Sequence, residues 1–154
     1  MRVLMVCLGN ICRSPMAEGI LQSLVKANDL DWEVDSAGTS TWHIGERPDR
    51  RAIATCDKNG LDIRHQHARQ FHPADFDDFD LILVMDRSNY QDVIRMAGTQ
   101  DHKKKVQLMT AYGNSGYVDV PDPYFDGSFD SVFILLQDLC NALISPYLDD
   151  QEDQ

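Results

Sequence analysis

Short apolar runs alternate along the chain with stretches in which apolar residues recur at helical spacing. The runs at 3–6, 32–37, 81–85 and 105–109 predict buried strands. Helical stripes predict helices over 14–25, 48–59 and 86–97 and from Ser128 onward, the last one ending at Pro146. Pro15 suits a first helical turn, where no amide hydrogen is required. Asp86 suits the cap of the third helix.

Strands that alternate with helices predict right-handed crossovers and a parallel sheet. The predicted fold is therefore a single α/β domain with a four-stranded parallel sheet, order 2-1-3-4, and helices on both faces. With 154 residues, 43% of them hydrophobic, one core is sufficient. We assign residues 1–148 to this domain and 149–154 to an acidic, disordered tail. Ligands of such sheets bind beyond the carboxyl ends of the strands, and the loop after the first strand lies there.

Charge and cysteine content exclude several classes of function. The net charge of −11 argues against a nucleic-acid partner. No apolar run approaches the length needed to cross a bilayer, so we predict no membrane partner and a cytoplasmic location. Four cysteines without a CxxC pair are expected to be free thiols, with Cys56 and Cys140 filling the core. No histidine pair has metal-site spacing, so we expect no metal and no cofactor.

Candidate chemistry is concentrated in the loop from Cys7 to Ser14. A loop between a strand and a helix N-terminus can direct several backbone N–H groups at one anion. A cysteine at its start lies in a positive field that favours the thiolate. An arginine at its end, Arg13, presents a planar fork that matches two phosphate oxygens. This arrangement predicts a site that binds a phosphate group and attacks its phosphorus with sulfur.

The full string around this loop resembles the signature of the low-molecular-weight protein tyrosine phosphatases. A second block, Asp122-Pro123-Tyr124, is similar to the segment that carries the general acid in that family. Weaker similarities extend over nearly the whole domain. The matching segments are Val6 to Pro15, Asp35 to Thr39, Arg47 to Asp49, Ala68 to Gln70, Met85 to Asn89 and Asp122 to Tyr124.

The resemblance implies roles for individual residues. Cys7 would be the nucleophile, Arg13 would bind the phosphate and the transition state, and Asp122 would act as general acid and then general base. Asn10 would hold the loop in shape, and Ser14 would donate a hydrogen bond to the thiolate. The backbone amides of the loop would bind the non-bridging phosphate oxygens. The residues assigned to phosphate binding are Leu8, Gly9, Asn10, Ile11, Cys12, Arg13 and Ser14.

The same resemblance predicts the substrate pocket and a redox partner. Trp42 and Tyr124 would flank the substrate ring, and Leu8 would form the floor. Cys12 would form a reversible disulfide with the nucleophile. This chain departs from the family in two places. Gln66 replaces the usual helper histidine, with His65 and His67 beside it, and the aromatic pair after Asp122-Pro123 is Tyr-Phe.

The predicted activity is a metal-independent phosphotyrosine phosphatase that works through a phosphocysteine intermediate. Its partner would be a phosphotyrosine-containing protein, for which a tyrosine kinase is a candidate. Two alternatives share the loop. An arsenate reductase would need further redox cysteines on a mobile segment, and Cys56 and Cys140 are isolated. A phosphocysteine carrier would not need an arginine and a general acid of this kind.

Overall fold

A parallel sheet of four strands forms the centre of the computed structural model, which describes the fold of residues 1–152 and the side chains of residues 1–148. The strands are β1 (Arg2–Cys7), β2 (Glu33–Gly38), β3 (Leu81–Val84) and β4 (Val106–Leu108). Their order is β2-β1-β3-β4, and every neighbouring pair is parallel. The predicted fold class and strand order are therefore confirmed.

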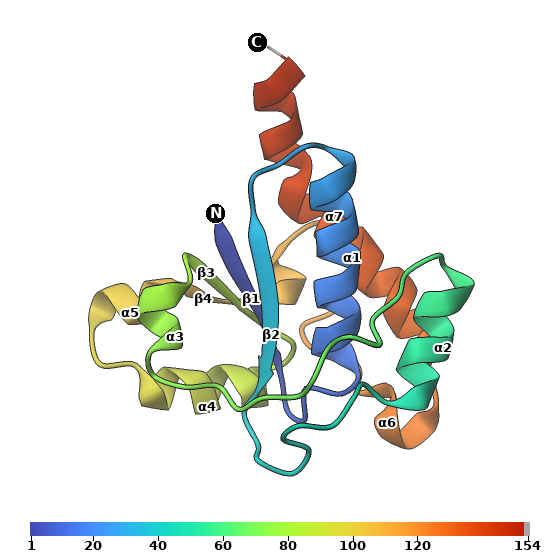
Figure 1. Ribbon diagram of the computed structural model, residues 1–154. Helices are drawn as coiled ribbons and strands as arrows, with labels where there is room; N and C mark the ends of the chain where they lie inside the picture. Colours follow the sequence, from blue (N-terminus) through green and yellow to red (C-terminus); the bar gives the residue numbers. More distant parts are fainter. Residues whose placement is uncertain (153–154) are drawn as a thin grey trace.

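Helices cover both faces of this sheet, as predicted (Figure 1). One side carries α1 (Arg13–Ala27), α2 (Arg50–Lys58) and the long α7 (Phe129–Glu152). The other side carries α3 (Asp75–Asp78), α4 (Arg87–Met96) and α5 (Gln100–Lys104). A 3-10 turn (Met109–Ala111) and the short α6 (Pro123–Asp126) lie in the connection to α7.

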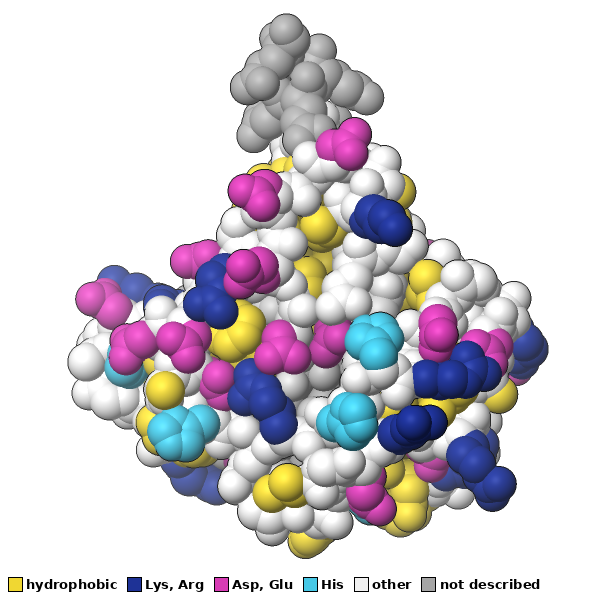
Figure 2. All heavy atoms as spheres, in the orientation of Figure 1, with side chains coloured by type: hydrophobic (Ala, Val, Ile, Leu, Met, Phe, Trp, Pro, Cys, Tyr) yellow, Lys and Arg dark blue, Asp and Glu magenta, His cyan; other side chains and the backbone are white. Residues whose placement is uncertain are grey.

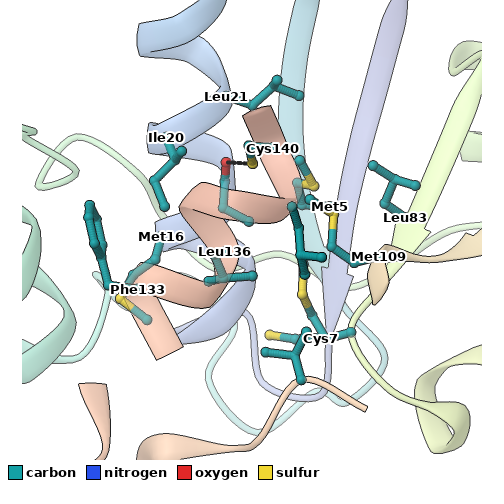
Figure 3. Close-up of a cluster of buried hydrophobic side chains, with 14 of the residues drawn as sticks. Met5, Cys7, Met16, Ile20, Leu21, Leu83, Met109, Phe133, Leu136 and Cys140 are labelled. Carbon is teal, nitrogen blue, oxygen red and sulfur yellow. Dashed lines mark hydrogen bonds between the residues drawn. The ribbon is translucent and has the colours of Figure 1, made fainter. Parts of the chain in front are cut away.

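The central strand β1 explains why its sequence is uniformly apolar. Val3 and Met5 belong to the core beneath α1 and α7, whereas Leu4 and Val6 belong to the core beneath α3 and α4. A strand buried on both faces has no solvent side on which polar residues would alternate. Figure 3 shows the first core, with Met5 among side chains of α1 and α7 and with Cys7 at its edge. The nucleophile candidate therefore stands at the end of the most buried strand.

Helix α7 differs from the prediction because it continues through Pro146 to Glu152. Tyr147 packs edge-on against Trp32, and Leu148 packs against the main core, so contacts on the far side of the proline offset the lost backbone hydrogen bond. Whether residues 149–154 form a disordered tail stays a prediction. The side chains of 149–152 and all of 153–154 lie outside the described residues.

Helix α7 also corrects the expectation about apolar length. Phe129–Leu148 is long and apolar enough, by length and composition alone, to cross a bilayer. Its apolar side, including Leu136, Leu139 and Leu143, lies in the core against α1. This is the pattern of a core helix. Its fully buried Cys140 donates a long hydrogen bond to the carbonyl oxygen of Ala17, 4.0 Å away (Figure 3).

Short helices are the other difference from the predicted elements. The apolar pattern predicts no element between residue 97 and the strand at 105–109, but Gln100–Lys104 is helical. Its N-cap is Thr99, whose hydroxyl accepts a hydrogen bond from the His102 N–H. The expected cap of α4 is confirmed, because the Asp86 carboxylate accepts from the Asn89 N–H at 2.7 Å. Cys56 and Cys140 are both completely buried, as predicted.

Candidate active site

The loop between β1 and α1 forms the floor of a pocket at the carboxyl end of the sheet. β1 ends at Cys7 and α1 begins at Arg13, so the connection is short and opens onto a helix N-terminus. Proline is tolerated at residue 15 because the first turn needs no amide hydrogen there. Nearly all of the predicted site residues meet in this pocket. It is lined by Cys7, Leu8, Gly9, Ile11, Cys12, Arg13, Trp42, His43, Asp122, Tyr124 and Phe125.

The Cys7 sulfur is held by donors from the loop behind it. The backbone N–H of Asn10 donates to Cys7 Sγ at 3.3 Å, and Ser14 Oγ lies 3.0 Å from the same sulfur. Ser14 Oγ already accepts a hydrogen bond from Asn10 Nδ2 at 2.8 Å. Its own hydrogen is therefore available to Cys7. Donors aimed at a sulfur stabilise its anionic form relative to the neutral thiol.

Asn10 joins the loop to the rest of the sheet. Its φ is 55°, a left-handed conformation that asparagine tolerates better than most residues. Its Nδ2 donates to Ser14 and, at 2.9 Å, to Ser36 on β2, and its Oδ1 accepts from the Arg69 N–H at 3.0 Å. These bonds hold a strained backbone in one shape. Asn10 and Ser14 thus support the pocket from behind and do not line it.

A buried carboxyl, Glu18, ends the same hydrogen-bond chain. Ser36 Oγ donates to Glu18 Oε1 at 2.8 Å, and Gln22 Nε2 donates to Glu18 Oε2 at 3.0 Å. Burial raises the pKa of Glu18 to about 7, although the two hydrogen bonds oppose that change. The chain from Cys7 to Glu18 therefore runs through Ser14, Asn10 and Ser36. This chain of bonds could not be predicted from the sequence, because Glu18 on α1 and Ser36 on β2 meet only when the helix packs against that strand.

Neither histidine beside Gln66 is buried at the site. His65 and His67 are both exposed, whereas Gln66 is buried and its Nε2 donates to the Pro15 carbonyl oxygen at 3.1 Å. The buried Gln66 side chain therefore fixes the start of α1. A supporting role for either histidine has no contact in its favour among the described residues.

The guanidinium of Arg13 is buried and fixed in orientation. Its Nη1 donates to Asp86 Oδ2 at 2.8 Å and to the Val120 carbonyl oxygen at 3.0 Å. Burial alone would lower the pKa of Arg13, but negative charge on Cys7 and the carboxylates of Asp86 and Asp122 raises it above its usual range. Arg13 therefore stays cationic at the pocket floor. Asp86, predicted only as a helix cap, also positions this cation.

Asp122 reaches the pocket from the opposite wall. Its backbone is extended (φ −90°, ψ 111°), as expected between Pro121 and Pro123, but it caps the short helix α6, which was not predicted. Oδ1 accepts from the Tyr124 N–H at 3.0 Å, and Oδ2 lies 3.6 Å from Arg13 Nη2. One carboxyl oxygen is thus anchored. The other faces Arg13, which the family resemblance assigns to the same site.

Aromatic residues form the mouth of the pocket. Trp42 and Tyr124, predicted to flank the substrate ring, both line it, and so does Leu8, predicted to form the floor. His43 and Phe125 line it too, and sequence reasoning assigned neither to the site, although each adjoins an assigned aromatic residue. Trp42 is 72% exposed and Phe125 is 84% exposed. The mouth therefore presents a large apolar surface to solvent, whereas the floor is polar and buried.

Cys12 shares the pocket with Cys7, and both are buried free thiols. Burial raises the pKa of Cys12, and the nearby negative charges of Asp49 and Cys7 add to that effect. Cys12 is thus held as a neutral thiol beside the nucleophile candidate. Within residues 1–148, no three His, Cys, Asp or Glu side chains are grouped so that they could hold a metal ion.

Comparison with known proteins identifies the family. The model of the family described as low molecular weight phosphotyrosine protein phosphatase matches residues 2–153. The chain belongs to this family. A putative low molecular weight protein-tyrosine-phosphatase of Synechocystis is 42% identical over 150 residues, which cover 94% of this chain and 95% of that protein.

Two solved structures extend the match to the fold. YfkJ from Bacillus subtilis superposes with a TM-score of 0.91 at 38% identity, covering 100% of this chain and 97% of that one. The Drosophila arginine phosphatase superposes with a TM-score of 0.89 at 38% identity, covering 96% and 98%. Members of the low molecular weight phosphotyrosine protein phosphatase family therefore share this whole domain, and one structural neighbour is named for a different phosphorylated residue.

Proposed function

We propose that this protein hydrolyses phosphotyrosine in proteins through a phosphocysteine intermediate, without a metal ion. One observation carries the proposal: Cys7 and Arg13 belong to one loop, Asp122 comes from a distant part of the chain, and all three line one pocket. Arg13 Nη2 lies within 3.6 Å of the Asp122 carboxylate, so a phosphate ester bound by the arginine would place its leaving oxygen near that acid. Family membership supports the same activity.

The first step transfers the phosphoryl group to sulfur. The phosphate would bind the loop amides and the Arg13 fork, which stabilise the charge on its non-bridging oxygens. The Cys7 thiolate forms a bond to phosphorus while the bond from phosphorus to the phenolic oxygen breaks. Asp122 gives its proton to that oxygen, because a phenolate is a poor leaving group. The products are phosphocysteine, a neutral tyrosine and an ionised Asp122.

The second step releases phosphate. Asp122, now ionised, takes a proton from a water molecule as that water attacks phosphorus. The bond between sulfur and phosphorus breaks, and the electron pair returns to Cys7. The Ser14 hydroxyl, 3.0 Å from Sγ, stabilises the departing thiolate. The cycle needs Cys7 ionised and Asp122 protonated at its start, so we expect an acidic optimum for kcat/KM.

The walls of the pocket favour an aromatic substrate. Trp42 and Tyr124 offer apolar surface at the mouth, and Leu8 and Ile11 offer it from the loop below, which suits a phenyl ring. The guanidinium of phosphoarginine would be desolvated on the same walls. A comparison of phosphotyrosine, phosphoserine and phosphoarginine peptides tests this: kcat/KM should be highest for phosphotyrosine. Autophosphorylated tyrosine kinases fall within this substrate class, and free thiols suit a cytoplasmic location.

The two alternatives on the same loop have less support. Arsenate reduction would need accessible partner thiols, and Cys56 and Cys140 are fully buried. A phosphocysteine carrier would have no use for Asp122 beside Arg13, because a general acid and base speeds the loss of the phosphoryl group. The arrangement therefore favours turnover over storage.

Hydrolysis of p-nitrophenyl phosphate in the presence of a chelator tests the proposed function. Wild-type protein should turn over this substrate, and vanadate should inhibit it. Cys7→Ser should reduce kcat by about 10⁴-fold or more, because a serine hydroxyl lacks an adjacent general base here. Circular dichroism of Cys7→Ser checks that the fold persists. Equal activity in the two proteins would refute the role of Cys7.

We propose further that Cys12 protects the nucleophile from irreversible oxidation. Peroxide would oxidise the Cys7 thiolate to a sulfenic acid, and the Cys12 sulfur would then displace water to form a disulfide. A thiol reductant would return both residues to their free state. Wild type should regain activity after peroxide and dithiothreitol, whereas Cys12→Ser should regain much less. Equal recovery would refute this role.

A further inference from the structure

Almost every arginine of this acidic chain is neutralised within the fold. The sequence has 25 acidic residues against 14 lysines and arginines. In the part of the chain whose side chains are described, seven arginines form an ion pair with a carboxylate. Within that part, Arg47 and Arg50 form no ion pair. The paired arginines are Arg2, Arg13, Arg51, Arg64, Arg69, Arg87 and Arg95.

These two arginines lie beside the mouth of the pocket. They flank Pro48-Asp49, and the Asp49 N–H donates to the carbonyl oxygen of Ile11 in the phosphate-binding loop at 2.8 Å. Both side chains are exposed. Figure 2 shows dark-blue side chains gathered at the lower right of the molecule, over the region where Figure 1 places α2 and α6. The backbone that carries Arg47 and Arg50 is therefore anchored directly to the site.

Nearby carboxylates leave the two cations available. Glu46 is hydrogen-bonded to the His43 ring, and Asp49 forms a two-pronged ion pair with Arg51. Arg51 itself is 5.4 Å from the centre of the Tyr124 ring, which lines the pocket. The described acids next to Arg47 and Arg50 thus already have partners, so an incoming carboxylate would not have to displace one.

We propose that Arg47 and Arg50 form a docking surface for acidic side chains that flank the phosphotyrosine of a protein substrate. The proposal rests on the proposed function, since the phosphate group in the pocket would hold the peptide across this rim. The guanidinium fork matches a carboxylate in shape and charge. The net charge of −11 would repel a polyanion such as nucleic acid or an anionic membrane. A few carboxylates next to Arg47 and Arg50 would feel mainly these two cations, because 0.1 M salt screens the protein's other charges beyond ~10 Å.

The test compares kcat/KM for two phosphotyrosine peptides that differ only in their flanks, Asp and Glu in one and Asn and Gln in the other. Wild type should prefer the acidic peptide by about threefold to tenfold at low ionic strength, mainly through KM, because exposed charge pairs contribute modestly. High salt should reduce this preference toward one. Arg47→Gln/Arg50→Gln should abolish it, while p-nitrophenyl phosphate, which has no flanks, should be hydrolysed within about twofold of wild type.

A matched control separates local contact from net charge. Lys103→Gln/Lys104→Gln removes the same charge from α5, at the opposite side of the molecule in Figure 1, and should keep the preference. The docking proposal is overturned if the arginine variant keeps the preference, or if the lysine variant loses it equally. If wild type hydrolyses neither peptide nor p-nitrophenyl phosphate, the proposed function fails and the docking proposal fails with it.

Discussion

The floor and the mouth of the pocket are built in opposite ways. The floor, residues 7–14, is buried except for the half-buried Leu8 and Gly9, and its polar side chains are bonded to one another or to distant parts of the chain. The mouth, Trp42, His43, Tyr124 and Phe125, is largely exposed, and its aromatic rings have few fixed partners. Chemistry that depends on charge stabilisation needs donors fixed before the substrate arrives. Recognition needs only surface of the right character, so the mouth can vary without disturbing the floor.

Among the residues other than Cys7, replacing Asp122, the proposed general acid, should give the largest effect. Asp122→Asn should lower kcat by about 10²-fold to 10⁴-fold for phosphotyrosine, because the amide cannot protonate the phenolic oxygen. The decrease in rate should be smaller for the first step with p-nitrophenyl phosphate, because nitrophenolate is a stable anion that can leave without being protonated. Steady-state and burst kinetics with both substrates measure this.

Asp126→Asn is the control for that experiment, since it makes the same charge change four residues away. It should keep kcat near the wild-type value. Equal losses in both variants would mean that local charge, rather than a positioned proton donor, sets the rate.

Removing the Asn10 side chain should disturb the floor as a unit. Asn10→Gly keeps the left-handed backbone accessible but loses the bonds to Ser14, Ser36 and Arg69, whereas Asn10→Ala loses the bonds and strains the backbone as well. We expect kcat to fall about 10-fold to 100-fold in both, because the donors shift relative to phosphorus. Asn10→Ala should unfold about 1 kcal/mol more easily than Asn10→Gly.

Measurements of kcat should therefore show a similar loss in both Asn10 variants, whereas thermal denaturation should show that Asn10→Ala is the less stable of the two. If Asn10→Gly had wild-type kcat, the loop would keep its shape without the side-chain bonds, and the contrast between a fixed floor and a variable mouth would lose its main support.

The buried carboxyl beneath the floor should make stability depend on pH. The pKa of Glu18 is about 7 in the folded protein against 4.5 in the reference state, so the folded form holds the proton more tightly. The contribution of Glu18 to the free energy of unfolding is fully present below pH 4.5, decreases as the pH rises toward 7, and is lost above pH 7. Glu18→Gln should therefore gain about 3 kcal/mol of stability relative to wild type between pH 4.5 and pH 8.

Urea denaturation of wild type and Glu18→Gln across this pH range measures the effect. Two stability curves that run parallel from acid to alkaline pH would contradict it.

Changes at the mouth should be the mildest. Trp42→Ala should raise KM for p-nitrophenyl phosphate about 2-fold to 10-fold with kcat nearly unchanged, because a lost aromatic wall weakens ground-state and transition-state binding together. Trp32→Ala is the matched control, since the second tryptophan packs on Tyr147 far from the pocket. A large kcat loss in Trp42→Ala would place this residue in the fixed floor.

The sequence predicted the parts of this molecule that depend on local order. The apolar run before Cys7, the loop to Arg13 and Pro15 in the first turn of α1 all follow from neighbouring residues. The strand order and the family could be predicted too. The meeting of Cys7, Arg13 and Asp122 came from the family resemblance, and the pocket brings these residues together.

The supporting contacts could not be predicted from the sequence. Asn10 reaches Ser36 and Arg69, which are 26 and 59 positions away, and the contacts exist only because of strand register. Helix α7 passes Pro146 because of tertiary contacts made by Tyr147 and Leu148. The ion pair of Arg13 with Asp86 likewise depends on β1 lying beside β3.

The central claim is that Cys7 carries the phosphoryl group during turnover, and trapping that intermediate tests it most directly. Asp122→Asn should accumulate it with p-nitrophenyl phosphate, because the leaving group departs without an acid while water lacks its base. Rapid quenching in denaturant followed by peptide mass spectrometry should find the phosphoryl group on Cys7, with a matching burst of nitrophenolate. Continued turnover with no phosphorylated Cys7 at any time point would contradict the account.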